Sequence, residues 1–281
     1  MTMVVMAAGV GSRFGGMKQL AAIGPSGETL FDYSVYDAVR SGFDRVVFVV
    51  SEQSRPAVAP HVEAGCGRHV EVRYAEQPPM GRKKPMGTGH ALLCACAETE
   101  GSFGVVNADD FYGTKSFEIL AGALKEDDED HVLVGFRLAD TLSPNGGVSR
   151  ARCMAENGLL MSIRELHEVQ QVDGVLSCKE GEELTGDELI SANLWGFRPD
   201  FCQTLAGDFE RFWAELGDSP DAEFLIGDAV ETVMKATGAD VRVVPTPEPF
   251  LGVTFREDVA GVASQIAMLV DQGVYPSPLW A

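Results

Sequence analysis

The sequence predicts an α/β protein with a mixed, mostly parallel sheet and helices on both faces. Two observations carry this prediction. In the first half, short β-branched apolar runs alternate with segments of helical periodicity, which is typical of β-α-β units. In the second half, alternating polar and apolar residues flank the turn Glu156-Asn157-Gly158 and indicate a hairpin. This hairpin predicts a small inserted β lobe.

The first half is expected to begin with a buried strand at residues 4–8 and a glycine-rich loop at 9–16. A helix follows at 30–40, where Thr29 and Asp32 form a capping pair and Gly42 is the stop signal. The remaining elements are recognised as β-branched or helical runs. They are strands at 45–50, 70–74, 103–107 and 131–138, and helices at 88–97 and 115–124.

The second half is less regular. The hairpin strands are expected at 147–153 and 159–164, and the acidic, weakly hydrophobic stretch 176–188 is interpreted as a mobile loop. A strand at 189–197, helices at 201–216 and 222–236, a strand at 241–244 and a closing helix at 257–269 complete the prediction. Because we find no repeats and no low-complexity linker, we expect one domain spanning residues 1–281.

Charge excludes several classes of partner. The 281 residues include 42 Asp or Glu and 22 Lys or Arg, which gives a net charge of −20. A protein surface that binds nucleic acid or an anionic membrane needs an excess of basic side chains. The excess is uneven, since residues 1–90 hold 10 basic and 8 acidic side chains and the rest hold 12 and 34. The near-neutral front leaves room for a local anion site.

Three further features bear on cellular location. The longest apolar run is shorter than the roughly 18 residues of a membrane span. The first six residues lack a basic region, so we expect no signal peptide and a cytoplasmic protein. The six cysteines are scattered, which favours free thiols. Cys94 and Cys96 lie two apart on a predicted helix and point to different sides, which argues against a metal pair.

The sharpest motif follows the first strand. It contains Gly9, Gly11, Ser12 and Arg13, with Lys18 five residues later. Glycines let successive N–H groups approach an anion, and the two cations add charge where phosphates would lie. The spacing fits neither the dinucleotide fingerprint nor the P-loop. A plain strand-to-helix turn is the alternative, and the added Arg and Lys make a phosphate site the better interpretation.

A pair of carboxylates ends another strand. Asp109 and Asp110 follow the apolar run 103–107, at the sheet edge where open α/β proteins bind ligands. Such carboxylates suit Mg²⁺, which takes one or two acids together with phosphate oxygens. The alternative is a helix N-cap. Gly113 and Thr114 offer another cap and weaken that alternative.

These stretches resemble the signature of nucleotidyltransferases of the sugar-nucleotide pyrophosphorylase type. The resemblance covers most of the chain and is specific in its N-terminal part and loose in its C-terminal part. It implies a glycosyltransferase-A-like, Rossmann-like fold. It also implies the condensation of a nucleoside triphosphate with a sugar 1-phosphate or similar phosphate monoester, with release of pyrophosphate and Mg²⁺ as cofactor. Residues 1–140 would be the nucleotide-binding half and 141–281 the acceptor-binding half.

The resemblance also implies roles in the nucleotide half. Arg13 would bind the leaving β- and γ-phosphates, Lys18 the reacting α-phosphate and Asp109 the metal. Contacts with the nucleotide would come from Ala8, Gly9, Gly11, Ser12, Gln77, Gly87 and Thr88. Between the base-reading residues lies the basic run Arg82-Lys83-Lys84, which is either a phosphate contact or a solvated face. His90 is interpreted as a packed or surface histidine rather than a catalytic one.

In the acceptor half the resemblance implies contacts by Gly147, Glu165 and Asn193, each of which is otherwise a turn or surface polar residue. One departure concerns the metal. Many relatives hold it with a second acid near the C-terminus, where this chain has Gly252. Asp258 is the nearest carboxylate, and it is either the second ligand or the cap of the closing helix.

The implied reaction is in-line attack of a phosphate oxygen on the α-phosphorus. The attacking oxygen is already an anion, so no general base is needed, and the chain shows no Ser-His-Asp or Cys-His set. Two alternatives stay open: a metal-dependent glycosyltransferase of the same fold, and a nucleotide-binding regulatory protein without turnover. The sequence leaves the nucleobase, the acceptor and the oligomeric state undecided.

Overall fold

An interior strand of the sheet, β1 (Thr2–Met6), is buried on both faces and separates the two main clusters of the core. The computed structural model describes residues 1–9, 14–82, 84–126, 128–219 and 221–280. Its strands are β1 (Thr2–Met6), β2 (Arg45–Val50), β3 (Glu71–Glu76), β4 (Phe103–Asn107), β5 (Asp110–Phe111), β6 (His131–Arg137), β7 (Val148–Glu156), β8 (Leu159–Val172), β9 (Val175–Ser177), β10 (Leu189–Phe197), β11 (Val241–Pro245) and β12 (Leu251–Gly252). Its α-helices are α1 (Leu30–Ser41), α2 (Arg55–Ala64), α3 (Thr88–Ala95), α4 (Thr114–Lys125), α5 (Asp200–Leu216), α6 (Ile226–Thr237) and α7 (Asp258–Asp271). Short 3₁₀ turns are η1 (Lys18–Leu20), η2 (Cys66–Arg68), η3 (Cys96–Glu98) and η4 (Leu138–Thr141).

The main sheet is mixed, and its strand order is β3-β2-β1-β4-β10-β6-β11-β8-β7. The first four strands are parallel, as the β-α-β pattern predicts. The second half departs from the predicted mostly parallel sheet, although β11 runs parallel to β6. There β10 runs antiparallel to both β4 and β6, and the strands of the lobe pair as hairpins. Because β10 lies between strands of the first half, both halves of the chain share this sheet.

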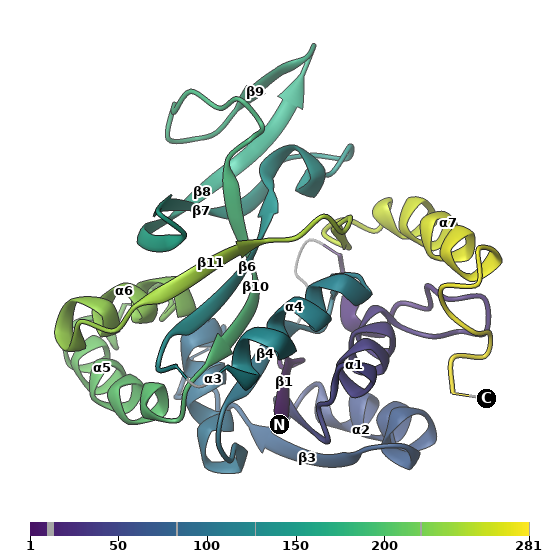
Figure 1. Cartoon of the computed structure of the whole chain (residues 1–281), viewed down its shortest axis with the longest axis horizontal. Coiled ribbons are helices and arrows are strands. Elements are labelled where there is room, and N and C mark those ends of the chain that lie inside the picture. The colour runs from purple at the N-terminus through teal and green to yellow at the C-terminus, as the bar shows by residue number, and fades with distance from the viewer. Residues whose placement is uncertain (10–13, 83, 127, 220, 281) are drawn as a thin grey trace.

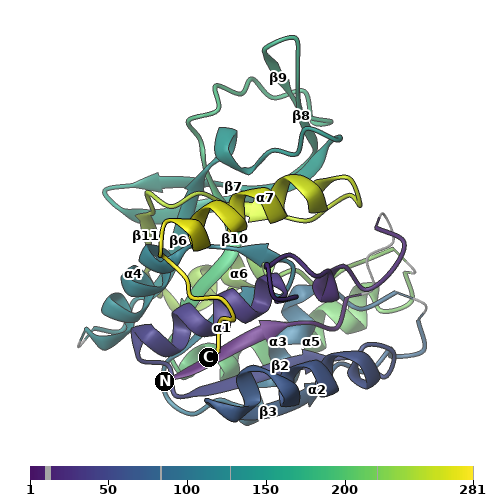
Figure 2. The same ribbon diagram turned by 90° about the vertical axis from the view of Figure 1, so that its right-hand side faces the viewer.

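Helices cover both faces of the sheet, as predicted. Met3 and Val5 of β1 point to the face that packs against α1, α2 and α4. Val4 and Met6 alternate to the opposite face, which α3, α5 and α6 cover. Figure 1 shows the two groups of helices on either side of the strands. A third, smaller core joins α7 to α1 and β5, and Figure 2 shows α7 crossing in front of the sheet.

The inserted lobe projects from the sheet at the top of Figure 1. It consists of β7, β8 and the short strand β9, which the sequence did not predict. The stretch interpreted as a mobile loop is tied to this lobe at several points. Glu182 forms ion pairs with Arg152 and Arg164, and Glu180 with His167. Residues 178–188 form no helix or strand, as the loop prediction expects, and these contacts hold them against the lobe.

Local signals explain which elements the sequence revealed. Helix α1 begins with the predicted capping box of Thr29 and Asp32 and ends at Gly42, which has a φ of +102°. Helix α2 was missed. It contains two prolines, Pro56 and Pro60, and few of its residues are buried, so its apolar pattern is weak.

The cysteine prediction needs one correction. The structure joins Cys96 and Cys202 in a disulfide, while Cys66, Cys94, Cys153 and Cys178 are free. The two bonded residues are 106 positions apart and meet because the turn after α3 lies against the start of α5. No local spacing in the sequence predicts such a pair.

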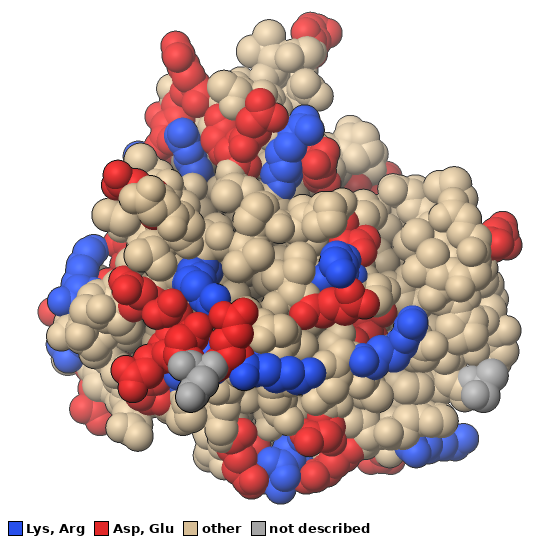
Figure 3. Space-filling view, in the orientation of Figure 1, with Lys and Arg blue, Asp and Glu red and all other residues tan. Residues whose placement is uncertain are grey.

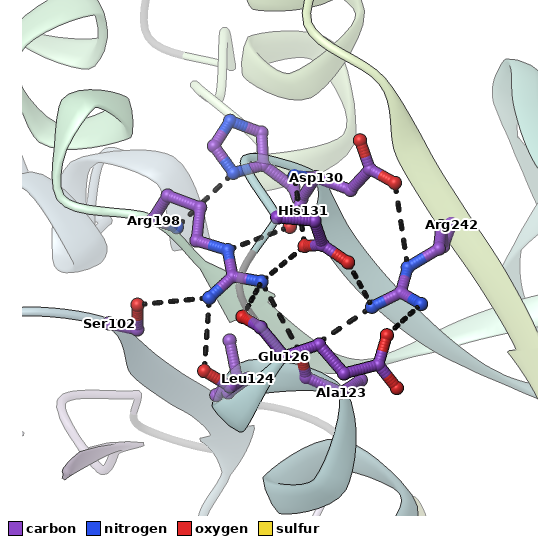
Figure 4. A network of polar contacts seen from close by, with 9 residues as sticks. Ser102, Ala123, Leu124, Glu126, Asp130, His131, Arg198 and Arg242 are labelled. Carbon is purple, nitrogen blue, oxygen red and sulfur yellow. Dashed lines mark hydrogen bonds and ion pairs between the residues drawn. The ribbon is translucent and has the colours of Figure 1, made fainter.

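A buried arginine fixes one end of β10. Arg198 follows this strand, and its guanidinium donates to the backbone oxygens of Leu124 and Asp130 at 3.0 Å each. Its backbone N–H donates to His131 Nδ1 at 3.2 Å. Figure 4 shows how these bonds join the end of α4, the start of β6 and neighbouring Arg242. The network anchors the strand that brings Asn193 to the opposite edge of the sheet.

Uncharged residues cover most of the face drawn in Figure 3, and charged side chains lie among them. Figure 3 shows acidic side chains in groups, with basic ones lying singly among them and over the projecting lobe. Within the described ranges, no helix is long and apolar enough to cross a membrane.

Candidate functional site

The site begins where β1 and β4 end side by side. Their parallel register pairs Met6 with Asn107, so the residues that follow emerge at one edge of the sheet. There Lys18 Nζ forms an ion pair with Asp109 Oδ2. Gln19 fixes the turn that carries Lys18, because its Nε2 donates to the backbone oxygens of Ala7 and Gly9 at 3.1 and 3.0 Å. The predicted phosphate lysine and the predicted metal acid therefore lie together.

The loop predicted to bind phosphate is described only in part. Gly11, Ser12 and Arg13 lie outside the described residues. Ala8 is buried, and its backbone oxygen accepts a hydrogen bond from Ser51 Oγ at 3.1 Å. Gly9 is exposed, and the space that a side chain would occupy there is open for at least 4 Å. The described end of the loop thus presents bare backbone beside Lys18.

A chain of side-chain amides leads from the carboxylates into the sheet. Asn107 Nδ2 donates to Asp110 Oδ2 at 2.7 Å, and Asn193 Nδ2 donates to Asn107 Oδ1 at 3.3 Å. Asn193 lies at an irregularity of β10 between Ser191 and Trp195 and has a φ of +61°. Trp195 Nε1 donates to Asn193 Oδ1 at 3.2 Å. The irregular strand and its hydrogen bonds hold Asn193 close to the two acids.

Asp110 is the more enclosed of the two adjacent carboxyls. Burial, reinforced by the neighbouring charge of Asp109, raises the pKa of Asp110 to about 7. The guanidinium of Arg150 faces the same carboxyl and opposes this shift. Arg150 is itself bound to the backbone oxygens of Thr141 and Ser149 and lies over the ring of Phe250. The guanidinium of Arg150 is therefore held in place by backbone oxygens, and its charge acts on Asp110.

The predicted base-reading residues are held by the segment before α6. Phe224 N donates to Met86 O at 2.7 Å, and Gly89 N donates to Phe224 O at 2.8 Å. A Cβ on Gly87 would lie 2.6 Å from Phe224 O, and one on Gly89 would lie 2.8 Å from the Phe224 ring. Both glycines are thus required for close contact with Phe224, a structural role that the motif alone does not reveal. Thr88 Oγ1 accepts a hydrogen bond from Ile226 N at 3.1 Å.

A cavity of about 160 Å³ joins the two halves of the predicted site. Thr88 lines it from the nucleotide half, and Glu165 and Asn193 line it from the acceptor half. Burial raises the pKa of the Glu165 carboxyl. Asp228, in the first turn of α6, also faces this cavity, and sequence reasoning missed it because an acid there is typical of a helix start.

Two predicted residues from the second half of the chain, Gly147 and Asp258, do not line this cavity. Gly147 packs against the backbone of Glu168, where a Cβ would lie 2.8 Å from the Glu168 Cα. Asp258 lines a separate cavity of about 500 Å³ beside α7. Its Oδ2 accepts from the N–H groups of Thr254 and Phe255 at 2.9 and 2.7 Å. Its Oδ1 accepts from two side chains of the loop at 143–145. Asp258 thus binds the segment before α7 and the loop at 143–145. The predicted helix cap is wrong, because α7 has no side-chain cap hydrogen bond.

The carboxylates at the sheet edge fit a magnesium ion whose coordination shell is completed by phosphate oxygens. Among the described residues, no group of three His, Cys, Asp or Glu side chains is arranged for a metal. Mg²⁺ usually takes only one or two protein acids and fills its shell with water and phosphate oxygens. A Cβ on Gly252 would lie 2.7 Å from Asp110 Oδ1, so the carboxylate of Asp110 already fills the space beside that glycine.

Comparison with known proteins decides the family. The family model described as "MobA-like NTP transferase domain" matches residues 3–175, more than half of the chain. The chain belongs to the MobA-like NTP transferase family. The match includes Lys18, Gln77, Thr88, Asp109 and Glu165. Asn193 lies beyond it.

Individual relatives of this NTP transferase agree with the family match. The bifunctional protein GlmU of Corynebacterium jeikeium is 36% identical over 115 residues, which are 39% of this chain and 22% of GlmU. The chain thus matches about a fifth of that relative's length. The inositol-1-phosphate CTP transferase from T. maritima has a TM-score of 0.65 at 16% identity, covering 94% of this chain and 95% of that one. A candidate glucose-1-phosphate thymidylyltransferase from Bacillus anthracis has a TM-score of 0.68 at 12% identity and covers 94% of each chain. The fold is therefore the mixed α/β fold of nucleotidyltransferases.

Proposed function

We propose that this NTP transferase condenses a nucleoside triphosphate with a phosphorylated sugar, polyol or similar monoester on a glycosyltransferase-A-like scaffold and releases pyrophosphate. The observation that carries the proposal is the cavity where Thr88 of the nucleotide half meets Glu165 and Asn193 of the acceptor half. The family supplies the class of reaction. The inositol 1-phosphate and glucose 1-phosphate named for the two similar structures support the acceptor class.

Lys18 and Asp109 are proposed as the charged centre of the reaction. In the chain as it stands, the ammonium and the carboxylate neutralise each other. Binding of a triphosphate would release Lys18 to the α-phosphate and Asp109 to Mg²⁺, with Asp110 beside it. When bound, Mg²⁺ supplies charge neutralisation at the phosphates. Arg13 is assigned to the β- and γ-phosphates from the motif.

The protein's part in the chemistry is positioning and charge. An oxygen of the acceptor phosphate forms a bond to the α-phosphorus, while the bond from that phosphorus to the bridging oxygen breaks and pyrophosphate leaves. The attacking oxygen carries no proton, so no side chain has to act as a base. Lys18 stabilises charge at the α-phosphate. Gln77, Gly87 and Thr88 hold the base, and Gly147, Glu165 and Asn193 orient the acceptor.

The proposal is tested by mixing each nucleoside triphosphate with a panel of phosphate monoesters and measuring pyrophosphate. We expect release only when triphosphate, acceptor and Mg²⁺ are all present. Hydrolysis of a sugar nucleotide without pyrophosphate formation would instead identify a glycosyltransferase. Calorimetric binding of nucleotide with no product from any acceptor would identify a regulatory protein.

The acceptor side of the cavity has its own test. Glu165→Gln keeps the shape of the side chain and removes its charge. The KM for the acceptor should rise, while the calorimetric affinity for the triphosphate should stay within about twofold of the unchanged protein. A loss of triphosphate affinity with no change in the acceptor KM would remove Glu165 from the acceptor site.

A further inference from the structure

Two contacts together define the orientation of the Gln77 carboxamide. Gln77 follows β3, and its backbone N–H donates to Val50 O at 2.8 Å, which fixes the start of the side chain. The side chain is 4% exposed, and its Nε2 lies 3.0 Å from Gly87 O. The amide oxygen has no proton to offer a carbonyl oxygen, so the NH₂ end must face Gly87. In the unchanged protein this orientation follows from the chemistry of the two groups.

The second proton of this NH₂ group faces a histidine. Gln77 Nε2 lies 3.3 Å from His90 Nδ1. An amide nitrogen is a donor only, so Nδ1 must accept and the ring proton must lie on Nε2. His90 Nε2 faces Cys94 Sγ at 3.7 Å, a weak acceptor suited to that proton. Burial lowers the pKa of His90, which agrees with a neutral ring whose Nδ1 lone pair is available.

The imidazole is held in place from the other side. His90 is 4% exposed, and its ring stacks on the ring of Phe209, with centroids 4.7 Å apart. Phe209 belongs to α5, a helix from the acceptor half of the chain. The position of Nδ1 is therefore set by packing as well as by its hydrogen bond.

The remaining atom of the carboxamide is its oxygen. Gln77 Oε1 receives no hydrogen bond from the described residues, and it is not among the fully buried atoms without a partner, so it retains contact with solvent. We propose that His90 is a positioning residue which, together with Gly87 O, takes both amide protons of Gln77, so that Gln77 presents only a hydrogen-bond acceptor to the nucleobase. This inference rests on the proposed function, in which Gln77 contacts the base.

The consequence is a rule for base recognition. The edge of the base that faces Gln77 must carry an N–H group: an exocyclic amine, as in cytosine and adenine, or a ring N–H, as in uracil, thymine and guanine. A base that turns a carbonyl oxygen toward Gln77 would bring two acceptors together with no proton between them. The triphosphates are therefore distinguished by how their donors are placed against one fixed oxygen.

Two substitutions of His90 separate its lone pair from its ring. His90→Phe keeps a ring against Phe209 and removes the acceptor, which leaves one buried Gln77 N–H without a partner. The carboxamide then gains by turning so that an N–H meets a carbonyl of the wrong base. His90→Asn removes the ring and keeps an oxygen acceptor close to the position of Nδ1. Cys94→Ala is the matched control, because it changes the contact at Nε2 and leaves Nδ1 untouched.

The readout is the dissociation constant of each of ATP, CTP, GTP and UTP, measured by calorimetry without acceptor. For the unchanged protein we expect one triphosphate to be preferred. In His90→Phe the ratio between the preferred and the next triphosphate should fall about tenfold, which corresponds to about 1.4 kcal/mol. His90→Asn and Cys94→Ala should retain the ratio, and thermal melting monitors the fold of all three variants.

Three results would overturn the inference: a preserved ratio in His90→Phe, an equal loss in His90→Asn, or no preference in the unchanged protein. Failure of the proposed function would look different. In that case no acceptor yields pyrophosphate, whatever the binding ratios are.

Discussion

Replacing Gly87 by alanine tests whether the contact with Phe224 shapes the base-reading segment. Gly87 has a φ of 97° and a ψ of 176°, a backbone conformation essentially restricted to glycine, which costs an L-residue roughly 1–3 kcal/mol. The new Cβ would also lie 2.6 Å from Phe224 O and 2.9 Å from Phe224 N. Relief requires Phe224 to move, which breaks its backbone hydrogen bonds to Met86 and Gly89, each worth about 1 kcal/mol. The expected loss of unfolding free energy is about 3–5 kcal/mol.

Gly101→Ala is the matched control for this substitution. Gly101 also has a positive φ, +69°, but nothing lies within 4 Å of the position of its Cβ. It should therefore show the conformational cost alone, roughly 1–2 kcal/mol in urea unfolding. Because Gly87 O also holds Gln77, Gly87→Ala should weaken triphosphate binding about tenfold, and Gly101→Ala should not. Equal stability and equal affinity of the two variants would refute the role assigned to Phe224.

Three further predictions concern other parts of the chain. Lys18→Met should lower kcat/KM by about 10²-fold or more in pyrophosphate assays. The control Lys115→Met removes an exposed ion pair on α4 and should leave kcat/KM unchanged. Similar kcat/KM values for the two variants would contradict the role of Lys18. Burial raises the pKa of Asp37 to about 6, so the native state keeps a proton that the unfolded state loses near pH 4, and the free energy of unfolding should fall as pH rises from about 4 to about 6. Asp37→Asn should reduce this fall by up to about 3 kcal/mol in urea titrations, and an unchanged slope would count against the shifted pKa. Thiol titration of air-oxidised, denatured protein should find four of the six cysteines free. Cys202→Ser should then lower the free energy of unfolding by up to about 4–5 kcal/mol. Six free thiols would contradict the pairing.

The sequence revealed the elements whose signals are local. The capping box and glycine stop define α1. The β-branched and alternating runs predict β2, β4 and β10 with the bounds that the structure shows. Helix α2 escaped because its prolines weaken the pattern. The direction of β10 escaped as well. An apolar strand pattern says nothing about which neighbours it pairs with or in which direction it runs.

The candidate site divides in the same way. Lys18 and Asp109 were identified because each stands in a motif directly after a buried strand, and the structure pairs them. Asp228, Phe224 and the Gln77–His90 contact depend on how α6 and α5 pack against α3, so no local pattern marks them. The Cys96–Cys202 bond was missed for the same reason.

The central claim is that the cavity between the two halves joins a nucleotide to a phosphorylated acceptor. The most direct measurement follows product and pyrophosphate together, by mass spectrometry and a coupled assay, for the best pair of substrates in the panel, with the acceptor labelled by ¹⁸O in its phosphate. The account predicts one pyrophosphate for each nucleotidylated acceptor, with the labelled oxygen bridging the two phosphorus atoms. Release of pyrophosphate without a nucleotidylated acceptor that carries the labelled bridging oxygen would contradict it. Release of free nucleotide without any nucleotidylated acceptor would also contradict it.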